Sequence, residues 1–530
     1  MHSSLFISLI GLGVIAQSAA AKPVRSCNDI TLPIVPGATI RSVNSRIYRD
    51  YSVPALPPTL VQNVTHLNFC EVNVTLSHWN EDDIVLVQTW LPLNNWNSRY
   101  LAVGGGAWAA GLGKFDLALP ASQGYAVSST NAGLSGNPID PSAWALKPDG
   151  TVNHGLLKNF ASRSVHDMAV VGKAVAASFY EVPATKAYFN GCSTGGRQGL
   201  AAAQQYPDDF DGILAGAPAI YWSEYVIAEL WPQVVMKDVN YYPSTCELDA
   251  FVSAAVESCD GKDGVADGVI TEPLTCEYDP FTLVGQTIEC GNESIVISQL
   301  AASIVSKIWR GPTGSRVNSL WYGMPKGASL AALAATKTVN GTITGAPFFV
   351  ADTWVRNFVK ADPSFDTSQL NVAGFEKLFS ESQHRFGHIM DSSDPSLHRF
   401  RTAGGKIIIW HGLSDQLIYP QDSIRYFKEV QKKCKSKGKS EDLGNFLRLF
   451  LAPGVDHCGF GQSAGAVPKD PFGALLAWVE DEKPPHTLDA HTKPDALTQF
   501  SRKICRYPAV AKYKGRGNTN DSKNYICAFP

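Results

Sequence analysis

Short apolar strands alternate with helices in two separate blocks of the sequence, and this alternation restricts the folds open to the chain. In the first block, residues 162–180 have apolar side chains at helical spacing and lie between expected strands. The expected strands and helices are 84–87, 100–103, 125–130, 162–180, 188–189, 196–206 and 212–215 in the first block, and 406–410, 421–432 and 446–451 in the second. The pattern predicts an α/β fold built on a mostly parallel sheet.

The stretch between the two blocks, residues 221–399, loses this rhythm. It contains four cysteines, an Asp/Gly-rich loop and many aromatic side chains. A chain of 530 residues is long enough for more than one domain or for one enlarged domain. We therefore expect residues 22–220 and 400–530 to form a catalytic domain, with residues 221–399 inserted as a lid.

The first residues of the chain are typical of a secretory signal peptide. A short apolar run ends in small residues, and cleavage after Ala21 places Ala19 at the other small-residue position. No later stretch has the roughly 18 apolar residues of a membrane span. Lys and Arg number 45 against 48 Asp and Glu, so the charge gives no indication of nucleic-acid binding. We expect residues 1–21 to be removed and the protein to be secreted, with no membrane or nucleic-acid partner.

Two further features fit an extracellular protein. Five Asn-x-Ser/Thr sequons predict N-glycosylation, at Asn63, Asn73, Asn292, Asn340 and Asn520. Eleven cysteines in an oxidising compartment should mostly form disulfides, and the odd number leaves at least one outside them. Cys434, in a basic stretch, is the first candidate for that position, whereas spacing alone leaves the pairing of the others open.

The sequence Gly191-Cys192-Ser193-Thr194-Gly195 follows an expected strand and precedes an expected helix. This is the context of a nucleophile elbow, in which small residues let the chain turn sharply and lift a serine hydroxyl above the sheet. A helix beginning at Gly195 or Gly196 would direct its free N–H groups toward a developing oxyanion. Ser193 is therefore the candidate nucleophile.

An elbow serine needs a base and an orienting acid, which in this type of fold follow it in the order acid, then histidine. Asp415 follows the expected strand 406–410 and is the candidate acid, and His457 follows the strand 446–451 and is the candidate base. Three competitors suit other roles better. His411 is expected to pack, Asp456 is too close to His457 to orient it, and His166 lies in a long helix.

The oxyanion hole is expected to use the backbone N–H of Thr194 and a second donor from an earlier strand-end loop. Gly104-Gly105-Gly106-Ala107-Trp108 directly follows the strand 100–103 and is the natural source of that donor. The choice between Gly105 and Gly106 stays open, and a plain glycine turn is the alternative.

With these residues in place, the sequence resembles the tannase and feruloyl esterase family. The resemblance is carried by residues 191–197, by Gly412-x-x-Asp415 and by His457-Cys458-Gly459, and it extends over essentially the whole mature chain. It implies an α/β-hydrolase fold and a disulfide between Cys192 and Cys458, beside the nucleophile and the base. Such a bond would keep the two in register, and we expect its loss to leave a folded but nearly inactive protein.

Residues 259–270 contain three aspartates interleaved with glycines, a composition suited to hard oxygen ligands, although the spacing is not that of an EF-hand. The family resemblance implies a structural calcium ion here, held by the carboxylates of Asp260, Asp263 and Asp267 and the carbonyls of Val265 and Val269; a solvated turn is the alternative. Cys259 and Cys276 flank the loop. The other expected pairs are Cys246 with Cys290, Cys27 with Cys70, and Cys505 with Cys527.

The resemblance also implies the reaction. We expect a secreted serine carboxylic ester hydrolase that cleaves feruloyl or other hydroxycinnamoyl esters through an acyl-enzyme, including esters carried on plant cell-wall polysaccharide. A tannase acting on galloyl esters is the alternative, and Thr194 disfavours it because tannases often have an acidic residue after the nucleophile. A serine carboxypeptidase and a non-catalytic binding protein on the same fold are more distant alternatives. Aromatic residues of the lid would form a slot for the substrate ring or the core of the lid. They are Tyr221, Trp222, Tyr225, Trp231, Trp321, Tyr322, Phe348, Phe349, Trp354 and Phe358.

Overall fold

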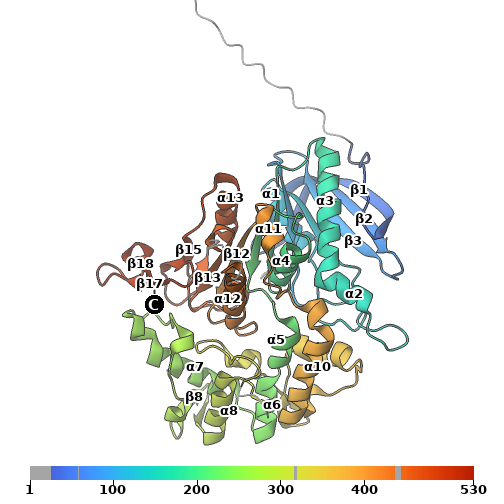
Figure 1. Cartoon of the computed structure of the whole chain (residues 1–530). Helices are drawn as coiled ribbons and strands as arrows, with labels where there is room; N and C mark the ends of the chain where they lie inside the picture. Colours follow the sequence, from blue (N-terminus) through green and yellow to red (C-terminus); the bar gives the residue numbers. More distant parts are fainter. Residues whose placement is uncertain (1–25, 58, 315–318, 436–442, 530) are drawn as a thin grey trace, which may run out of the picture.

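The computed structural model describes residues 26–57, 59–314, 319–435 and 443–529. The expected signal peptide lies outside these residues. The protein is built on a nine-stranded sheet with helices on both of its faces, and a long inserted segment lies against one end of it (Figure 1).

The strand order in the sheet is β1-β2-β3-β5-β4-β6-β7-β12-β13. The strands from β5 to β13 pair in parallel, as the apolar strand pattern predicts, whereas β1, β2, β3 and β5 pair antiparallel. The bounds are β1 (Ala38–Val53), β2 (Val64–His78), β3 (Val85–Pro92), β4 (Arg99–Val103), β5 (Ala126–Thr130), β6 (Lys186–Cys192), β7 (Gly212–Gly216), β12 (Lys406–Gly412) and β13 (Leu447–Ala452).

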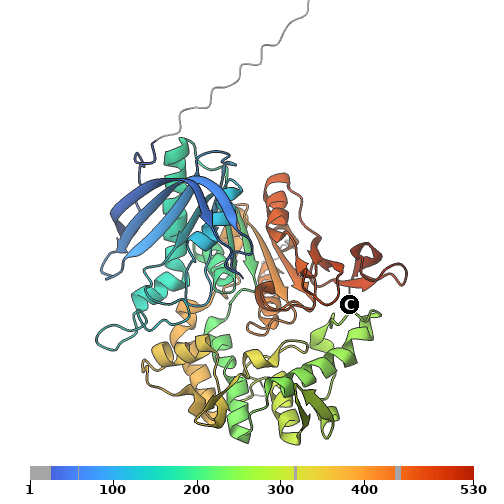
Figure 2. The ribbon, with the colours of Figure 1, turned by 180° about the vertical axis from the view of Figure 1, so that it is seen from behind.

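The antiparallel edge of the sheet, formed by β1 and β2, was not predicted from the sequence. These two strands are the longest in the molecule and curve across its back (Figure 2). Most residues of β1 are exposed or half-buried, because it is an edge strand with one side in solvent. Such a strand lacks the continuous apolar run that marks β12, and the sheet is therefore mixed rather than mostly parallel.

Two sets of helices bury the two faces of the sheet. Helices α3 (Ser164–Tyr180), α4 (Thr194–Gln205) and α12 (Gln421–Lys435) contribute buried residues to the apolar cluster on one face. Helices α1 (Lys114–Ser122) and α13 (Pro471–Asp481) contribute to the cluster on the other face. Both faces of the central strands are covered, as parallel strands require.

Residues 222–402, which we call the inserted segment, connect β7 to β12 and add no described strand to the nine-stranded sheet. Its buried residues Trp222, Trp354 and Phe386 belong to the same apolar cluster as Phe189 of β6, so it shares a core with the sheet. Its helices are α5 (Trp222–Ala228), α6 (Trp231–Val239), α7 (Thr245–Cys259), α8 (Gln299–Arg310), α9 (Phe349–Trp354), α10 (Val372–Met390) and α11 (His398–Thr402), with hairpins β8 (Thr287–Cys290)–β9 (Glu293–Val296) and β10 (Thr336–Val339)–β11 (Thr342–Gly345).

The C-terminal part adds two small antiparallel sheets beside β13. One contains β14 (Val467–Pro468), β15 (Thr487–His491) and β16 (Ser501–Cys505), and the other pairs β17 (Val510–Tyr513) with β18 (Tyr525–Ala528). Five disulfides brace the fold, and they are the five expected pairs: Cys27–Cys70, Cys192–Cys458, Cys246–Cys290, Cys259–Cys276 and Cys505–Cys527. Cys434 lies outside these bonds.

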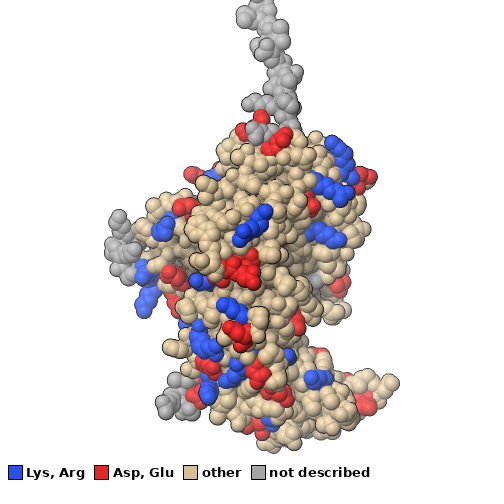
Figure 3. Space-filling view, turned by 90° about the vertical axis from the view of Figure 1, so that its right-hand side faces the viewer, with Lys and Arg blue, Asp and Glu red and all other residues tan. Residues whose placement is uncertain are grey.

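The described surface agrees with the composition. On the face drawn in Figure 3, basic and acidic side chains are interspersed rather than gathered by sign. None of the helices in the described ranges is long and apolar enough to cross a membrane.

Candidate active site

The turn between β6 and α4 has the geometry of a nucleophile elbow. Ser193 adopts φ 63° and ψ −123°, a strained conformation for a residue with a side chain. Its N–H donates to the carbonyl oxygen of Gly216 on β7 at 3.0 Å, which holds the turn in place. Helix α4 begins at Thr194, one or two residues earlier than expected, so its first free N–H groups lie directly beside the serine.

Two glycines allow the loop after β4 to lie against this elbow. A Cβ atom on Gly104 would lie 2.6 Å from the Cα atom of Gly195, which leaves no room for a side chain. The N–H of Gly195 donates to the carbonyl oxygen of Gly105 at 3.0 Å. The backbone of the glycine loop, residues 104–108, is therefore fixed next to Ser193.

Within this loop, the hydrogen bonds separate Gly105 from Gly106. The N–H of Gly105 donates to Oε1 of Gln198 on α4 at 3.1 Å and is already used. The N–H groups of Gly106 and Thr194 donate to no group in the described part of the chain. Thr194 also donates its hydroxyl to the carbonyl oxygen of Ala107 at 2.8 Å, which ties the loop to the start of α4. Of the two candidate glycines, Gly106 is therefore the one whose N–H is left for an oxyanion, together with that of Thr194.

Asp415 lies in the loop after β12, fully buried, and its carboxylate is surrounded by donors. Oδ1 accepts the backbone N–H groups of Leu417 and Ile418, both at 2.9 Å. Oδ2 lies 2.8 Å from Nδ1 of His457. Burial alone would raise the pKa of Asp415, but the charges and hydrogen bonds of His457 and His411 hold it well below its usual range. Asp415 is a stable anion at neutral pH.

His411, which we expected to pack, is fully buried and also contacts the candidate acid. Its Nε2 lies 3.1 Å from Oδ2 of Asp415 and 2.8 Å from the carbonyl oxygen of Ile418, and both of these atoms accept. Nε2 therefore carries the hydrogen, and Nδ1 accepts from the hydroxyl of Ser423 at 2.8 Å. His411 is fully buried, as expected of a packing residue, but its position at a strand end did not show that its ring would face the candidate acid.

The remaining competitors have other partners. Asp456 accepts a hydrogen bond from the hydroxyl of Ser463 and does not orient His457. His166 bonds to Asp209 at 2.8 Å. Both are placed as the sequence suggested.

A disulfide joins the loops of the candidate nucleophile and the candidate base. Cys192 ends β6 and Cys458 follows the candidate base; they are 266 positions apart, with their Cα atoms 6.1 Å from each other. The N–H of His457 also donates to Oε1 of Gln416 at 3.1 Å. His457 is thus anchored through its ring, its backbone and its neighbouring cysteine.

The Asp/Gly loop of the inserted segment begins with a short 3₁₀ turn, Asp260–Asp263. Asp260 accepts the N–H groups of Asp267 and Gly268 at 3.1 and 2.8 Å, and Asp267 forms an ion pair with Arg502. The pKa of Asp267 is raised to about 6, chiefly by burial; Arg502 lowers it, and the nearby charges of Asp260 and Asp263 raise it.

Two features of this loop bear on its ability to bind a cation. The carbonyl oxygens of Val265 and Val269 accept no hydrogen bond from the described residues, which leaves two hard oxygen donors beside the three carboxylates. In their present orientation, however, the described side chains form no group of three or more acids, histidines or cysteines arranged around one ion. The donor chemistry suits calcium, and the carboxylates are turned toward backbone N–H groups.

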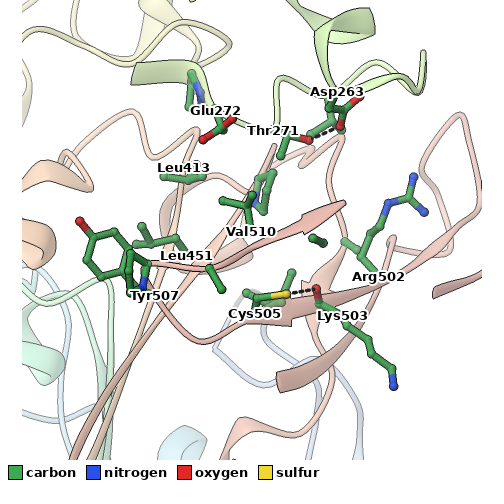
Figure 4. Close-up of a pocket in the computed structure, with 18 of the residues that line it drawn as sticks. Asp263, Thr271, Glu272, Leu413, Leu451, Arg502, Lys503, Cys505, Tyr507 and Val510 are labelled. Atoms are coloured by element: carbon green, nitrogen blue, oxygen red, sulfur yellow. Dashed lines mark hydrogen bonds between the residues drawn. The ribbon is translucent and has the colours of Figure 1, made fainter. Parts of the chain in front are cut away.

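A cavity of about 280 Å³ separates this loop from the C-terminal strands. Asp263 and Glu272 reach it from the inserted segment, and Cys505 and Val510 from β16 and β17 (Figure 4). Ser193 and His457 are not among the residues that line it, so it is separate from the candidate catalytic centre.

The predicted sequons differ in accessibility. Asn63, Asn292, Asn340 and Asn520 are exposed, whereas Asn73 is half-buried within β2. Of the aromatic residues considered for a substrate slot, Tyr322, Phe348 and Phe349 are half-buried and the others are buried, with Trp222, Trp354 and Phe358 at 1%, 0% and 0% exposure. These three form part of the core.

Comparisons with known proteins show which family the chain is similar to. The family model described as tannase and feruloyl esterase matches residues 70–528. A probable feruloyl esterase of Arthroderma benhamiae is 46% identical over 99% of this chain and 98% of its own length. Two solved structures are similar: a tannin acyl hydrolase from Aspergillus niger (TM-score 0.84, 26% identity, 94% and 93% of the two chains) and feruloyl esterase B from Aspergillus oryzae (0.77, 25%, 94% and 98%).

Proposed function

The chain belongs to the tannase and feruloyl esterase family and is a carboxylic ester hydrolase, and from this premise we propose that it hydrolyses esters of phenolic acids with Ser193 as the nucleophile. Three features together carry the proposal: the strained elbow at Ser193, the Asp415–His457 hydrogen bond of 2.8 Å, and the disulfide that joins the loops of Ser193 and His457.

In this mechanism, Nε2 of His457 takes the proton of the Ser193 hydroxyl as its oxygen attacks the ester carbonyl. Asp415 accepts Nδ1–H and stabilises the imidazolium that forms. The N–H groups of Thr194 and Gly106 bind the oxyanion of the tetrahedral intermediate. His457 then gives its proton to the departing alkoxide, and the alcohol leaves an acyl-enzyme on Ser193.

The second half repeats the steps with water. His457 removes a proton from a water molecule, which attacks the acyl carbonyl, and the same two N–H groups bind the new oxyanion. When the intermediate collapses, His457 returns the proton to Oγ of Ser193 and the phenolic acid is released. Every proton passes through Nε2 of one histidine, so the fixed position of its ring matters at each step.

A feruloyl or other hydroxycinnamoyl ester is the proposed substrate, including esters on plant cell-wall polysaccharide. The names of the sequence relatives favour this assignment, as does Thr194, which is not acidic. Galloyl esters are the second candidate, because a tannin acyl hydrolase has a TM-score of 0.84 with this chain. We propose that the inserted segment acts as a lid that covers the acyl group.

The test is a comparison of methyl ferulate, methyl caffeate and methyl gallate, with a blocked dipeptide as the probe for carboxypeptidase activity. We expect kcat/KM to be highest for a hydroxycinnamate ester and the dipeptide to stay intact. Turnover of gallate alone would replace the feruloyl assignment by a tannase, and cleavage of the dipeptide would replace both.

We also propose a structural calcium ion in the Asp/Gly loop, held by the carboxylates of Asp260, Asp263 and Asp267 and the carbonyls of Val265 and Val269. Two features support it: the two carbonyls accept no hydrogen bond from the described residues, and three acids lie in one loop, where a cation would neutralise them. The ion would supply structural charge compensation.

Secretion and glycosylation belong to the same proposal. The five disulfides are typical of an oxidising compartment. Asn63, Asn292, Asn340 and Asn520 are accessible acceptors, whereas the half-buried Asn73 is a poorer one. Mass spectrometry of the protein secreted by a fungal host would show which are used and whether the chain begins after Ala21.

A further inference from the structure

The glycine loop is held from two sides, and the two sides come from different parts of the chain. Gln198, Thr194 and Gly195 of α4 bond to it from the sheet side. On the other side, the indole Nε1 of Trp108 donates to Oγ1 of Thr353 in helix α9 at 2.9 Å, across 245 positions. Among the described residues, Thr353 is the member of the inserted segment that hydrogen-bonds this loop.

This contact is buried and fixed in orientation. Trp108 is 1% exposed and Thr353 8% exposed. The threonine hydroxyl donates to the carbonyl oxygen of Phe349, one turn earlier in α9, at 2.7 Å, so it accepts from the indole with its lone pair. Because both residues are buried, losing either partner would leave a buried polar group of the other unpaired, and each therefore helps to fix the position of the other.

Aromatic rings surround the indole and extend the contact. The ring centroids of Trp222, Phe358 and Phe160 lie 5.3, 5.4 and 5.5 Å from that of Trp108. Trp222 begins α5 and Phe358 lies in the π-helical turn Val355–Val359, so both belong to the inserted segment. The guanidinium of Arg197, four residues after Ser193, lies over the rings of Phe160 and Trp222.

The position of Trp108 matters because the proposed oxyanion donor is two residues away. Ala107, between Gly106 and Trp108, adopts φ 49°, a left-handed conformation that is costly for alanine and needs support from its surroundings. We propose that Trp108 and Thr353 are positioning residues, through which the inserted segment holds the N–H of Gly106 in place for the oxyanion. This inference rests on the proposed function.

The test is Thr353→Val, which removes the acceptor while keeping the shape of the side chain. The matched control is Ser382→Ala, because the Ser382 hydroxyl has the same two bonds, accepting from Nε1 of Trp354 at 2.9 Å and donating to a carbonyl at 2.7 Å. Ser382 lies in the same buried region but does not contact the glycine loop. Thr353→Ser restores the hydroxyl, and Trp108→Phe removes the same bond from the other side if Thr353→Val does not fold.

We expect Thr353→Val and Trp108→Phe to lower kcat for methyl ferulate by about 10- to 100-fold, with KM within about twofold of the wild type. The rate at which an aryl phosphonate labels Ser193 should fall in parallel, since that reaction also forms an oxyanion. Thr353→Ser should recover most of kcat, and Ser382→Ala should keep it.

An unchanged kcat in Thr353→Val, or an equal loss in Thr353→Val and Ser382→Ala, would overturn the inference. Ser193→Ala separates this failure from failure of the proposed function. If Ser193→Ala is inactive while Thr353→Val is normal, only the positioning role is wrong; if Ser193→Ala is active, the proposed nucleophile is wrong.

Discussion

The candidate catalytic loops and the Asp/Gly loop both place aspartates in turns near a disulfide. The pKa values of these aspartates are nevertheless shifted in opposite directions. Asp415 is one anion with two backbone N–H groups and two histidines around it, and its pKa is held well below the usual range. Burial is the main reason that the pKa of Asp267 is raised to about 6; Arg502 lowers it, and two nearby acids add a smaller increase. Protein groups already compensate the first carboxylate, whereas under the proposed calcium assignment a cation would compensate the second.

The largest effect should come from removing the charge at the first site. Asp415→Asn keeps the shape but cannot stabilise the imidazolium, and it favours the wrong tautomer of His457, so we expect kcat/KM to fall by about 10⁴-fold. Asp456→Asn, next to His457 in sequence but bonded to Ser463, is the control and should lose less than about threefold. Similar losses in the two variants would show that Asp415 has no special role.

The disulfides provide the next test. Replacing Cys192 and Cys458 with alanine should leave a folded protein with kcat lowered by about 100-fold, because the loops of nucleophile and base lose their register. The matched pair, Cys259 and Cys276, closes 17 positions beside the Asp/Gly loop. Its removal should lower Tm and calcium affinity and leave kcat near normal. Near-normal turnover of the first double variant, shown to be folded by circular dichroism, would contradict the comparison.

Removal of metal should affect only the second site. EDTA should extract about one calcium per chain and lower Tm by several degrees, because an ion that binds the folded state alone stabilises it. In Asp260→Asn/Asp267→Asn the same treatment should change Tm little. A wild-type Tm that is indifferent to EDTA, with no calcium found by atomic absorption, would leave the loop as a solvated turn.

The smallest effect is the pH dependence of the difference in Tm between the protein with calcium and the protein treated with EDTA. The pKa of Asp267 without metal is raised to about 6 in the folded state, above its unfolded value of about 4, so its ionisation destabilises the metal-free protein increasingly between these pH values. Calcium binds the ionised form, and the Tm gained with calcium should therefore grow from about pH 4 to about pH 6 and then level off. A gain in Tm that is constant over this range would contradict the assigned ligands.

The ionisation of Asp415 has the opposite effect on stability. Because its pKa is lowered in the folded state, its ionised form stabilises the fold above about pH 4, and this stabilisation is lost in acid.

Features fixed by local sequence were predictable. The elbow at Ser193 needs only a strand, small residues and a helix in succession, and Asp415 and His457 follow apolar strands that are continuous in the sequence. The parallel strands were found for the same reason, whereas the half-exposed edge strand β1 has no such run.

Features that depend on distant partners were not predictable. The choice of Gly106 over Gly105 required the position of the Gln198 side chain, which lies on another element. The contact of Trp108 with Thr353 spans 245 positions and has no local sequence signal. The contact of His411 with Asp415 had a weak sequence signal, since His411 lies four residues before Asp415 at a strand end.

The most direct test of the account is the labelling of Ser193. The wild-type protein is incubated with an aryl phosphonate, digested and mapped by mass spectrometry, while the hydrolysis of methyl ferulate is followed in parallel. We predict one phosphonyl group per chain on Oγ of Ser193, with activity lost in proportion, and no label in Ser193→Ala. Full hydrolysis of methyl ferulate by protein labelled at Ser193, or by Ser193→Ala, would contradict the account.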